Sequence, residues 1–201
     1  NVEIAPNSRV RLVESRNDLH RLALERGRLS ARILAPPRLF IVDTPSAVAV
    51  DLGCAYTLEV EDNGDSRLHV TSGYVALERN DHDVIVPAGA VAVSKKGIGI
   101  GTPFAENASE EYRSTLYKID FENGDQASLK RLVAVSGKSD SVTLFHLIRT
   151  VPASDRGMVL ARLTKFVKLP QGTTAAGLIA LDQKMLDDLW EQINVAGIGG
   201  F

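Results

Sequence analysis

The sequence predicts a segregated α+β protein, in which an all-β half of the chain precedes an α-helical half. Three observations lead to this prediction. Before about residue 103, apolar and polar residues alternate in short runs bounded by turn-forming residues, which is typical of β-strands. After that point, apolar residues recur at helical spacing. Between the halves, Gly97, Gly99, Gly101 and Pro103 interrupt both patterns, so we expect a β domain over residues 1–103 and an α-helical domain over residues 104–201.

The first half contains short alternating runs separated by clear turn signals. The strongest signal is Asp62-Asn63-Gly64-Asp65, which favours a hairpin because asparagine and glycine tolerate positive φ. The expected strands are Val2–Ile4, Val10–Glu14, Arg21–Glu25, Arg28–Leu34, Leu39–Val42, Ala47–Leu52, Ala55–Glu61, Arg67–Thr71, Tyr74–Arg79, Asp83–Val86 and Ala90–Ser94.

A weak internal repeat runs through these strands. In Leu22–Ala31, Leu68–Leu77 and Val84–Val93, two alternating runs meet at or near a glycine. A glycine at such a point lets a strand bend sharply. Because the copies are unevenly spaced, the pattern indicates a two-layer sandwich or a short, irregular β-coil and not a regular solenoid.

The second half contains helical patterns preceded by capping residues. The expected helices are Glu110–Asp120, Gln126–Val135, Ser141–Thr150, Asp155–Lys168, and one or two across Ala175–Ile193. Their expected N-caps are Ser109, Asp125, Asp140, Ser154, Thr174 and Asp182. Apolar residues of the last helix form one stripe, which predicts either a packed core face or a concave protein-binding face.

The stretch Phe40–Gly89 resembles the FecR domain of bacterial transmembrane regulators. The resemblance rests on an extended strand with Thr-Pro-small, an alternating run into a glycine, an aromatic-containing strand, a rung with a central glycine, and a closing rung. These elements are Phe40–Ala47, Val48–Gly53, Cys54–Val60, Val70–Leu77 and Val86–Gly89. The family commonly has Gly-Thr where this chain has Gly53-Cys54. The resemblance covers roughly residues 1–95 and rests on structural motifs.

The resemblance implies a role in regulating an alternative sigma factor through protein–protein contact. It implies an extracytoplasmic, periplasmic domain anchored by an inner-membrane helix upstream of Asn1, which binds a receptor signalling domain or another envelope protein. Many siderophore-signalling members continue into a small α/β module, whereas this chain continues into helices. An alternative reading is an envelope module that binds glycan or another small ligand without signalling.

Composition excludes several other classes. A net charge of −2 and a pI near 6.1 disfavour a general nucleic-acid binder. The first 38 residues hold eight arginines against four acids, which favours a solvated strand face over a binding patch. The single cysteine, Cys54, cannot form an internal disulfide. No segment is long and apolar enough to span a bilayer, although the start at Asn1 leads us to expect residues upstream.

The chemical inventory predicts neither an enzyme nor a cofactor. The histidines, His20, His69, His82 and His146, have no metal-pair spacing, and Asp81-His82-Asp83 is expected to be an exposed turn. Cys54 is expected to be a small buried residue. The acidic run Glu59–Asp65 lacks the order of a calcium loop, and Gly97–Gly101 lacks the spacing of a phosphate loop. We therefore assign no catalytic, cofactor-binding or metal-binding residues.

Overall fold

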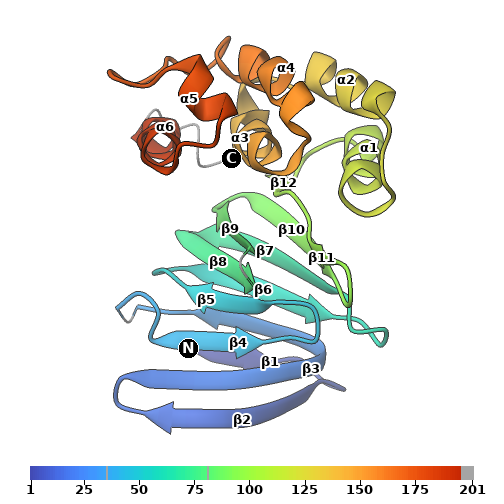
Figure 1. Cartoon of the computed structure of the whole chain (residues 1–201). Coiled ribbons are helices and arrows are strands. Elements are labelled where there is room, and N and C mark those ends of the chain that lie inside the picture. The colour runs from blue at the N-terminus through green and yellow to red at the C-terminus, as the bar shows by residue number, and fades with distance from the viewer. Residues whose placement is uncertain (35, 81, 196–201) are drawn as a thin grey trace. The chain divides into compact units, whose positions relative to one another are not determined.

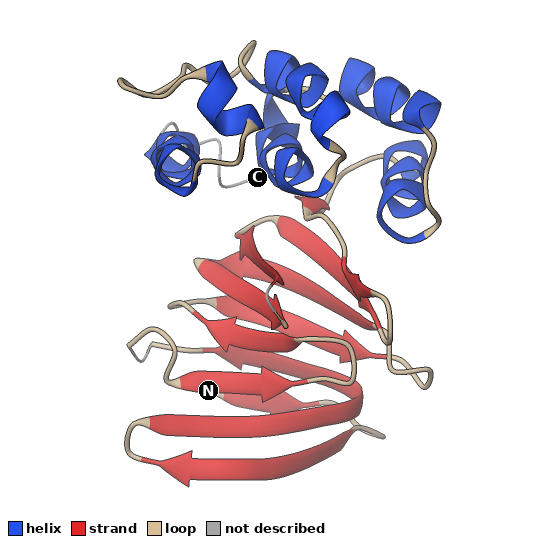
Figure 2. Cartoon of the chain, in the orientation of Figure 1, coloured by secondary structure: helices blue, strands red, loops and turns tan. Residues whose placement is uncertain are grey.

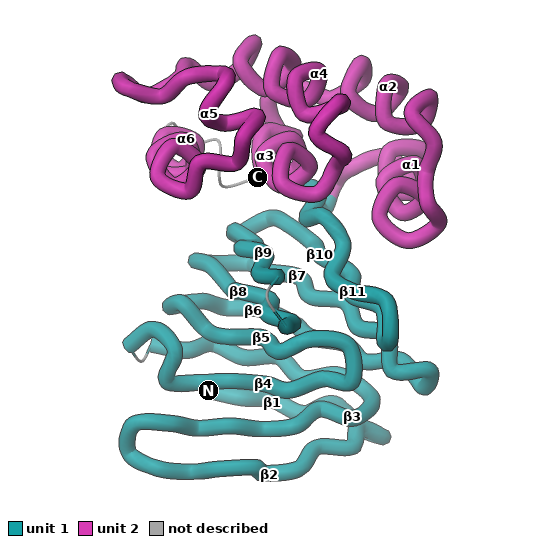
Figure 3. The backbone as a smooth tube through the Cα atoms, viewed as in Figure 1, with its two compact units in different colours: residues 1–106 teal, residues 107–201 magenta. Residues whose placement is uncertain are grey.

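The computed structural model describes residues 1–34, 36–80 and 82–195, and the chain divides into two compact units. The units are Asn1–Glu106 and Asn107–Phe201 (Figure 3). Strands occupy the first unit and helices the second (Figure 2). The predicted segregated α+β fold class is therefore confirmed.

The first unit is a mixed sheet of twelve strands. One path through the sheet runs in the order β11-β10-β7-β6-β3-β4-β5-β8-β9, with β1 and β2 on β3 and β12 on β10 (Figure 1). The strands are β1 (Val2–Ile4), β2 (Arg9–Arg16), β3 (Leu19–Arg32), β4 (Phe40–Asp43), β5 (Val48–Asp51), β6 (Ala55–Val60), β7 (Ser66–Ser72), β8 (Tyr74–Arg79), β9 (His82–Pro87), β10 (Ala90–Lys95), β11 (Gly99–Ile100) and β12 (Phe104–Ala105).

Strand β3 joins two ladders of this sheet. Its first half pairs with β2 and β4, and its second half pairs with β1 and β6. We predicted two strands here, but the structure has one long strand that bends at Gly27, where φ is +96°. Because glycine lacks a Cβ atom, the bend needs no break in the chain.

The other predicted glycine bends also mark passages between the ladders. Gly73, with φ +67°, leads from β7 in one ladder to β8 in the other. Gly89, with φ +75°, leads back from β9 to β10. Strands β9 and β10 lie in contact, so the sheet curls into a nearly closed, barrel-like arrangement. The repeat seen in the sequence therefore corresponds to a repeated corner, a glycine at which the chain passes from one ladder to the other.

The apolar core of the first unit lies between the ladders. Leu29 and Leu58 come from one ladder and Val42 and Leu77 from the other, and all four are 1% exposed or less. The alternation read from the sequence therefore places apolar side chains of the central strands inside. Strands β11 and β12 were not predicted, because two-residue strands carry no periodicity.

The second unit contains six α-helices and one 3₁₀ turn among the described residues. They are α1 (Glu110–Phe121), α2 (Gln126–Val135), η1 (Lys138–Asp140), α3 (Ser141–Thr150), α4 (Ala153–Leu163), α5 (Ala175–Ile179) and α6 (Gln183–Val195). Helix α4 ends five residues earlier than predicted, because Lys165, Phe166 and Val167 turn back onto the carbonyls of Arg162 and Leu163.

Five of the six predicted N-caps are confirmed, and one is wrong. Ser109, Asp125, Thr174 and Asp182 accept backbone N–H bonds at the starts of α1, α2, α5 and α6. Asp140 is the N-cap of α3 as predicted, but its carboxylate accepts from the backbone N–H of Gly137, 2.7 Å away, in the preceding turn. Ser154 lies inside α4, whose N-cap is Pro152. The carbonyl of Pro152 accepts the backbone N–H of Asp155 at 2.9 Å, in the first turn of the helix.

The apolar stripe of α6 is core. Leu186, Leu189 and Ile193 are 3% exposed or less, and α3 is buried over eight of its ten residues. Within the described part of this unit, Val135 is the one large hydrophobic residue that is strongly exposed. The core reading of the stripe is therefore confirmed. No helix among the described residues has the length and hydropathy needed to cross a membrane.

Candidate protein-docking edge

The residues that carry the FecR resemblance build the interior and the corners of the first unit. Thr44 closes a tight turn, in which its hydroxyl accepts from the backbone N–H of Ala47 (3.0 Å) and donates to the Ala47 carbonyl (2.7 Å). This turn aims Ser46 into the core. The Thr-Pro-small motif is therefore a structural device.

Three buried serine hydroxyls meet where that turn enters the core. Ser46, Ser66 of β7 and Ser94 of β10 bond to one another at 2.7–2.9 Å, and each is 3% exposed or less. Each hydroxyl can donate one bond and accept one, so the ring satisfies itself without water. The ring links the turn between β4 and β5 to two strands of the opposite ladder.

A second buried polar group surrounds Cys54. The Cys54 thiol donates to a carboxylate oxygen of Asp51, which is fully buried, and burial followed by this bond raises the thiol pKa well above its usual range. Burial likewise raises the pKa of Tyr56. A thiol held protonated is a poor nucleophile, so the geometry gives Cys54 no catalytic character. Its predicted burial is confirmed.

The four histidines lie on four different elements. His20 bonds to Ser15 at 3.3 Å on the β2–β3 turn, and His69 pairs with Glu106. His146 is buried beside the rings of Phe145 and Trp190. His82 lies in β9, and Asp81 lies outside the described residues. Among the described residues, no three His, Cys, Asp or Glu side chains lie close enough together to hold a metal ion.

The open end of the sheet differs from this closed interior. Strand β2 is the outermost strand there, and within the described residues it pairs with β3 alone (Figure 1). All eight of its residues are exposed or half-buried. A strand with one unpaired edge presents free backbone donors and acceptors to a partner.

The edge strand also carries apolar side chains in an unusual arrangement. A β-bulge falls at Val13, because Leu12 is opposite Leu22 whereas Glu14 is opposite Arg21. In a regular strand, two consecutive residues point to opposite faces, but a bulge re-aims one of them. Leu12 is 64% exposed and Val13 is 40% exposed. The centre of the edge is thus apolar on the outside.

Arginines flank this apolar centre. Arg9 and Arg11 share the carboxylate of Glu25 at 3.9 and 3.8 Å, too far for hydrogen bonds. Arg16 has closer partners, Glu14 at 2.9 Å and Asp18 at 3.5 Å. The guanidinium donors of Arg9 and Arg11 are therefore the ones along β2 that stay available to a partner.

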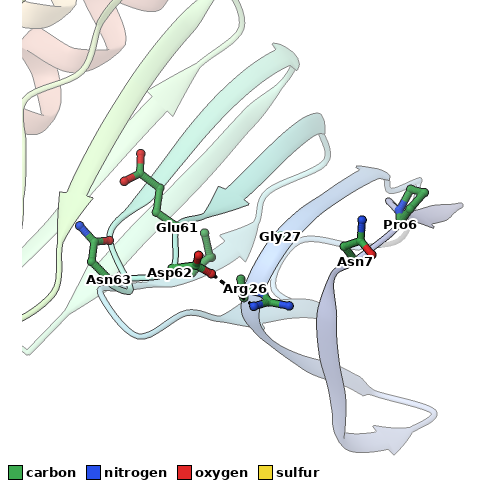
Figure 4. A pocket seen from close by; sticks show the side chains of 8 residues that line it. Pro6, Asn7, Arg26, Gly27, Glu61, Asp62 and Asn63 are labelled. Carbon is green, nitrogen blue, oxygen red and sulfur yellow. Dashed lines mark hydrogen bonds and ion pairs between the residues drawn. The ribbon is translucent and has the colours of Figure 1, made fainter.

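A groove of about 690 Å³ lies at the base of the same ribbon. Pro6 and Asn7 precede β2, and Arg26 and Asp62 form an ion pair at 3.4 Å, as Figure 4 shows. Arg26 is opposite Arg9 in the β2–β3 register, so the groove adjoins the end of the edge. Gly27 and three residues of the neighbouring hairpin, Val60, Glu61 and Asn63, complete the lining.

The comparisons with known proteins bear on the first unit. The family model described as FecR protein matches residues 1–76. The first unit carries a FecR-family domain. This confirms the resemblance found in the sequence, over the part of the chain that holds β1 to β7 and the first residues of β8. No curated protein matches the chain.

Two solved structures have a related shape. Both are crystal structures of "a putative anti-sigma factor from Parabacteroides distasonis ATCC 8503", at 1.65 and 2.50 Å resolution. Each is 16% identical, with a TM-score of 0.44, and the match covers 58% of this chain and 55% of the other. The chain thus spans little more than half the length of those proteins, and similarity at this level does not transfer a function.

The sequence did not identify β2 as an exposed edge strand. We read the arginine-rich start of the chain as a solvated strand face and expected a strand over Val10–Glu14. The adjacent apolar pair Leu12-Val13 within an otherwise alternating run was the available signal, because it breaks the period of two. Which strand lies at the edge, however, depends on pairing across the whole sheet.

Proposed function

We propose that this chain is the non-enzymatic, protein-binding part of a FecR-like regulator of an alternative sigma factor. It acts by protein–protein contact through the FecR domain. In the native protein this domain lies in the periplasm, anchored by an inner-membrane helix upstream of Asn1. Its partner is a receptor signalling domain or another envelope protein.

The FecR family match carries this proposal. Two features of the structure support it. Several buried polar groups of the FecR domain bond to one another in structural roles, as the serine ring illustrates. In contrast, the β2 edge has free strand donors, an apolar centre and available guanidinium groups. Such a surface suits a protein partner better than a small substrate.

The proposal is tested in the native host with the full-length gene. A reporter is placed under the promoter controlled by the neighbouring sigma factor, and the segment 1–106 is deleted in frame. If the FecR domain transmits a signal, reporter output changes severalfold when the inducing condition is applied. A deletion of 107–201 run in parallel tells whether the helical unit is needed as well.

The result that contradicts the proposal is an unchanged reporter, with the truncated protein present at normal level in the envelope fraction. Immunoblotting of that fraction supplies the level. That outcome favours the alternative of a ligand-binding envelope module, for which glycan-array binding of the intact chain is the direct measurement.

A further inference from the structure

We propose that the β2 edge binds an extended acidic segment of a partner protein, which adds to the sheet as an antiparallel strand. The inference rests on the proposed function, because it names the kind of segment by which the regulator's partner docks. It is carried by three independent properties of β2: its unpaired edge, its charge and its apolar centre.

The positive charge of the β2 edge indicates that its partner segment is negatively charged. Strand β2 holds three arginines and one glutamate, in a chain whose overall net charge is −2. Arg9 and Arg11 are 3.8–3.9 Å from the one carboxylate that they share. An arginine forms its strongest bonds with a carboxylate in a bidentate, hydrogen-bonded geometry. Carboxylates on an incoming strand would supply that geometry to both side chains.

The same charge argues against a second copy of the chain as the occupant. Each β2 strand holds three arginines and one glutamate, so two copies side by side would bring together strands that each carry a net charge of +2. In an antiparallel pair centred between Leu12 and Val13, Arg11 would face Glu14, but Arg9 of one copy would face Arg16 of the other at both ends. Like charges directly opposite each other destabilise a strand pair. A partner strand with acidic residues at these positions removes that repulsion.

The apolar centre of the β2 edge indicates that the middle of the partner segment is apolar as well. Leu12 and Val13 are both exposed, the bulge falls at Val13, and the pair lies between the arginines. Cross-strand pairs of β-branched or aliphatic residues stabilise a sheet and fix its register. We therefore expect a segment of about eight residues with valine or isoleucine at its centre and glutamate or aspartate toward its ends, matching the eight residues of β2.

The test uses a designed peptide and the intact chain. The probe is a fluorescein-labelled peptide of sequence Glu-Thr-Lys-Val-Ile-Glu-Val-Glu, which is complementary to β2 in the antiparallel direction. A second peptide, Glu-Thr-Lys-Pro-Ile-Glu-Pro-Glu, keeps every charge but cannot form a continuous strand. Fluorescence anisotropy should show that the first peptide binds with a Kd of roughly 100 μM or below. The second peptide should bind at least tenfold more weakly.

Matched charge reversals locate the site. The double variant Arg9→Glu/Arg11→Glu should weaken the first peptide at least tenfold. The control Lys130→Glu/Arg131→Glu changes the net charge by the same amount at two exposed positions of α2 and should leave Kd within a factor of two. Circular dichroism of both variants checks the fold. Hydrogen exchange should slow at amides of Val10–Ser15 and not in β9 when the peptide is added.

Several results overturn the inference. Equal binding of both peptides would mean charge attraction without strand addition. Equal weakening by both double variants would mean that β2 is not the site. A dimer in sedimentation equilibrium that dissociates on Leu12→Lys but not on Ile98→Lys would mean that a second copy occupies the edge.

The host experiment separates this inference from the proposed function. An unchanged reporter on deletion of 1–106, with specific peptide binding, would refute the regulatory function but not the docking edge. A responsive reporter, with no binding of the strand-forming peptide, would refute the docking edge alone.

Discussion

The interior of the FecR domain and its β2 edge are both built from alternating strands, but they differ in burial and in how fully their polar groups are paired. Inside, glycine corners, buried leucines and a closed ring of hydroxyls leave little for a partner to contact. At the edge, an eight-residue strand presents apolar side chains and loosely paired arginines to solvent. The buried interior therefore stabilises the domain, whereas the exposed β2 edge is the region that we propose binds a partner. Both regions consist of alternating strands.

The largest loss of stability is expected at a glycine corner. A Cβ atom at Gly73 would lie 1.9 Å from the carbonyl oxygen of Gly53, and φ there is +67°. Gly73→Ala should lower the free energy of unfolding by about 4 kcal/mol, from backbone strain and overpacking together. Gly97 has φ +83° but open space around it, so Gly97→Ala should cost only about 1 kcal/mol. Urea unfolding followed by circular dichroism measures both, and equal effects would contradict the corner argument.

Truncating a core leucine is the next largest test. Leu58 is fully buried between the ladders, so Leu58→Ala should lower the free energy of unfolding by about 3 kcal/mol through the cavity left behind. Leu12→Ala on the exposed edge should change it by less than about 0.5 kcal/mol. A Leu12 variant as destabilised as the Leu58 variant would remove the distinction between the two regions.

Removing one hydroxyl from the serine ring should have an intermediate effect on the free energy of unfolding. Ser46→Ala leaves Ser66 and Ser94 each short of one partner in a site without solvent access, which should cost about 1–2 kcal/mol. Ser15→Ala removes an exposed hydroxyl that bonds to His20 and should be nearly neutral. Thermal unfolding of the two variants compares them directly, and a neutral Ser46 variant would count against the ring as a stabilising device.

Alkaline pH should act on the interior through Cys54. Burial raises the pKa of its thiol in the folded protein, so the folded state holds the proton after the unfolded chain has lost it. This stabilisation is complete below an unfolded pKa of about 8.5 and declines above it by at most about 1.4 kcal/mol per pH unit. Urea titrations between pH 8 and 10 should show the decline in the native chain and a smaller slope in Cys54→Ala. In the folded chain, iodoacetamide should react only slowly with Cys54.

The smallest effect is the one that a substitution in one unit is expected to have on the unfolding of the other unit. We propose that the domains expected at residues 1–103 and 104–201 unfold independently. Trp190, the only tryptophan, reports on the helical unit, and far-ultraviolet circular dichroism near the strand band reports on the sheet. Leu58→Ala should shift the strand transition and leave the Trp190 transition unchanged. A joint shift of both transitions would show that the units unfold together.

The local elements were predictable where the period was long and regular. Helices α2 and α3 begin and end where apolar spacing and capping residues placed them, and β8 has its predicted bounds. The prediction of a cap failed where two local signals competed. Ser154 is an acceptable cap by residue type, but the chain enters α4 two residues earlier, at Pro152.

The candidate site was less predictable than the fold. The arginines of β2 and its adjacent apolar pair are visible in the sequence, but an alternating run has the same appearance in a central strand as in an edge strand. The serine ring could not be predicted either, because its members are up to 48 residues apart. Only the assembled sheet brings them within hydrogen-bond distance.

By itself, the sequence determined the division into strands and helices, the glycine corners and the FecR resemblance. Each of these depends on residues close together in the chain, through side-chain periodicity, allowed backbone angles and short motifs. The tertiary structure alone decided that β2 is an edge, that Leu12 and Val13 both face outward, and that the α6 stripe is covered. Those properties depend on which segments pair and pack over long sequence distances, and local physical chemistry does not encode that choice.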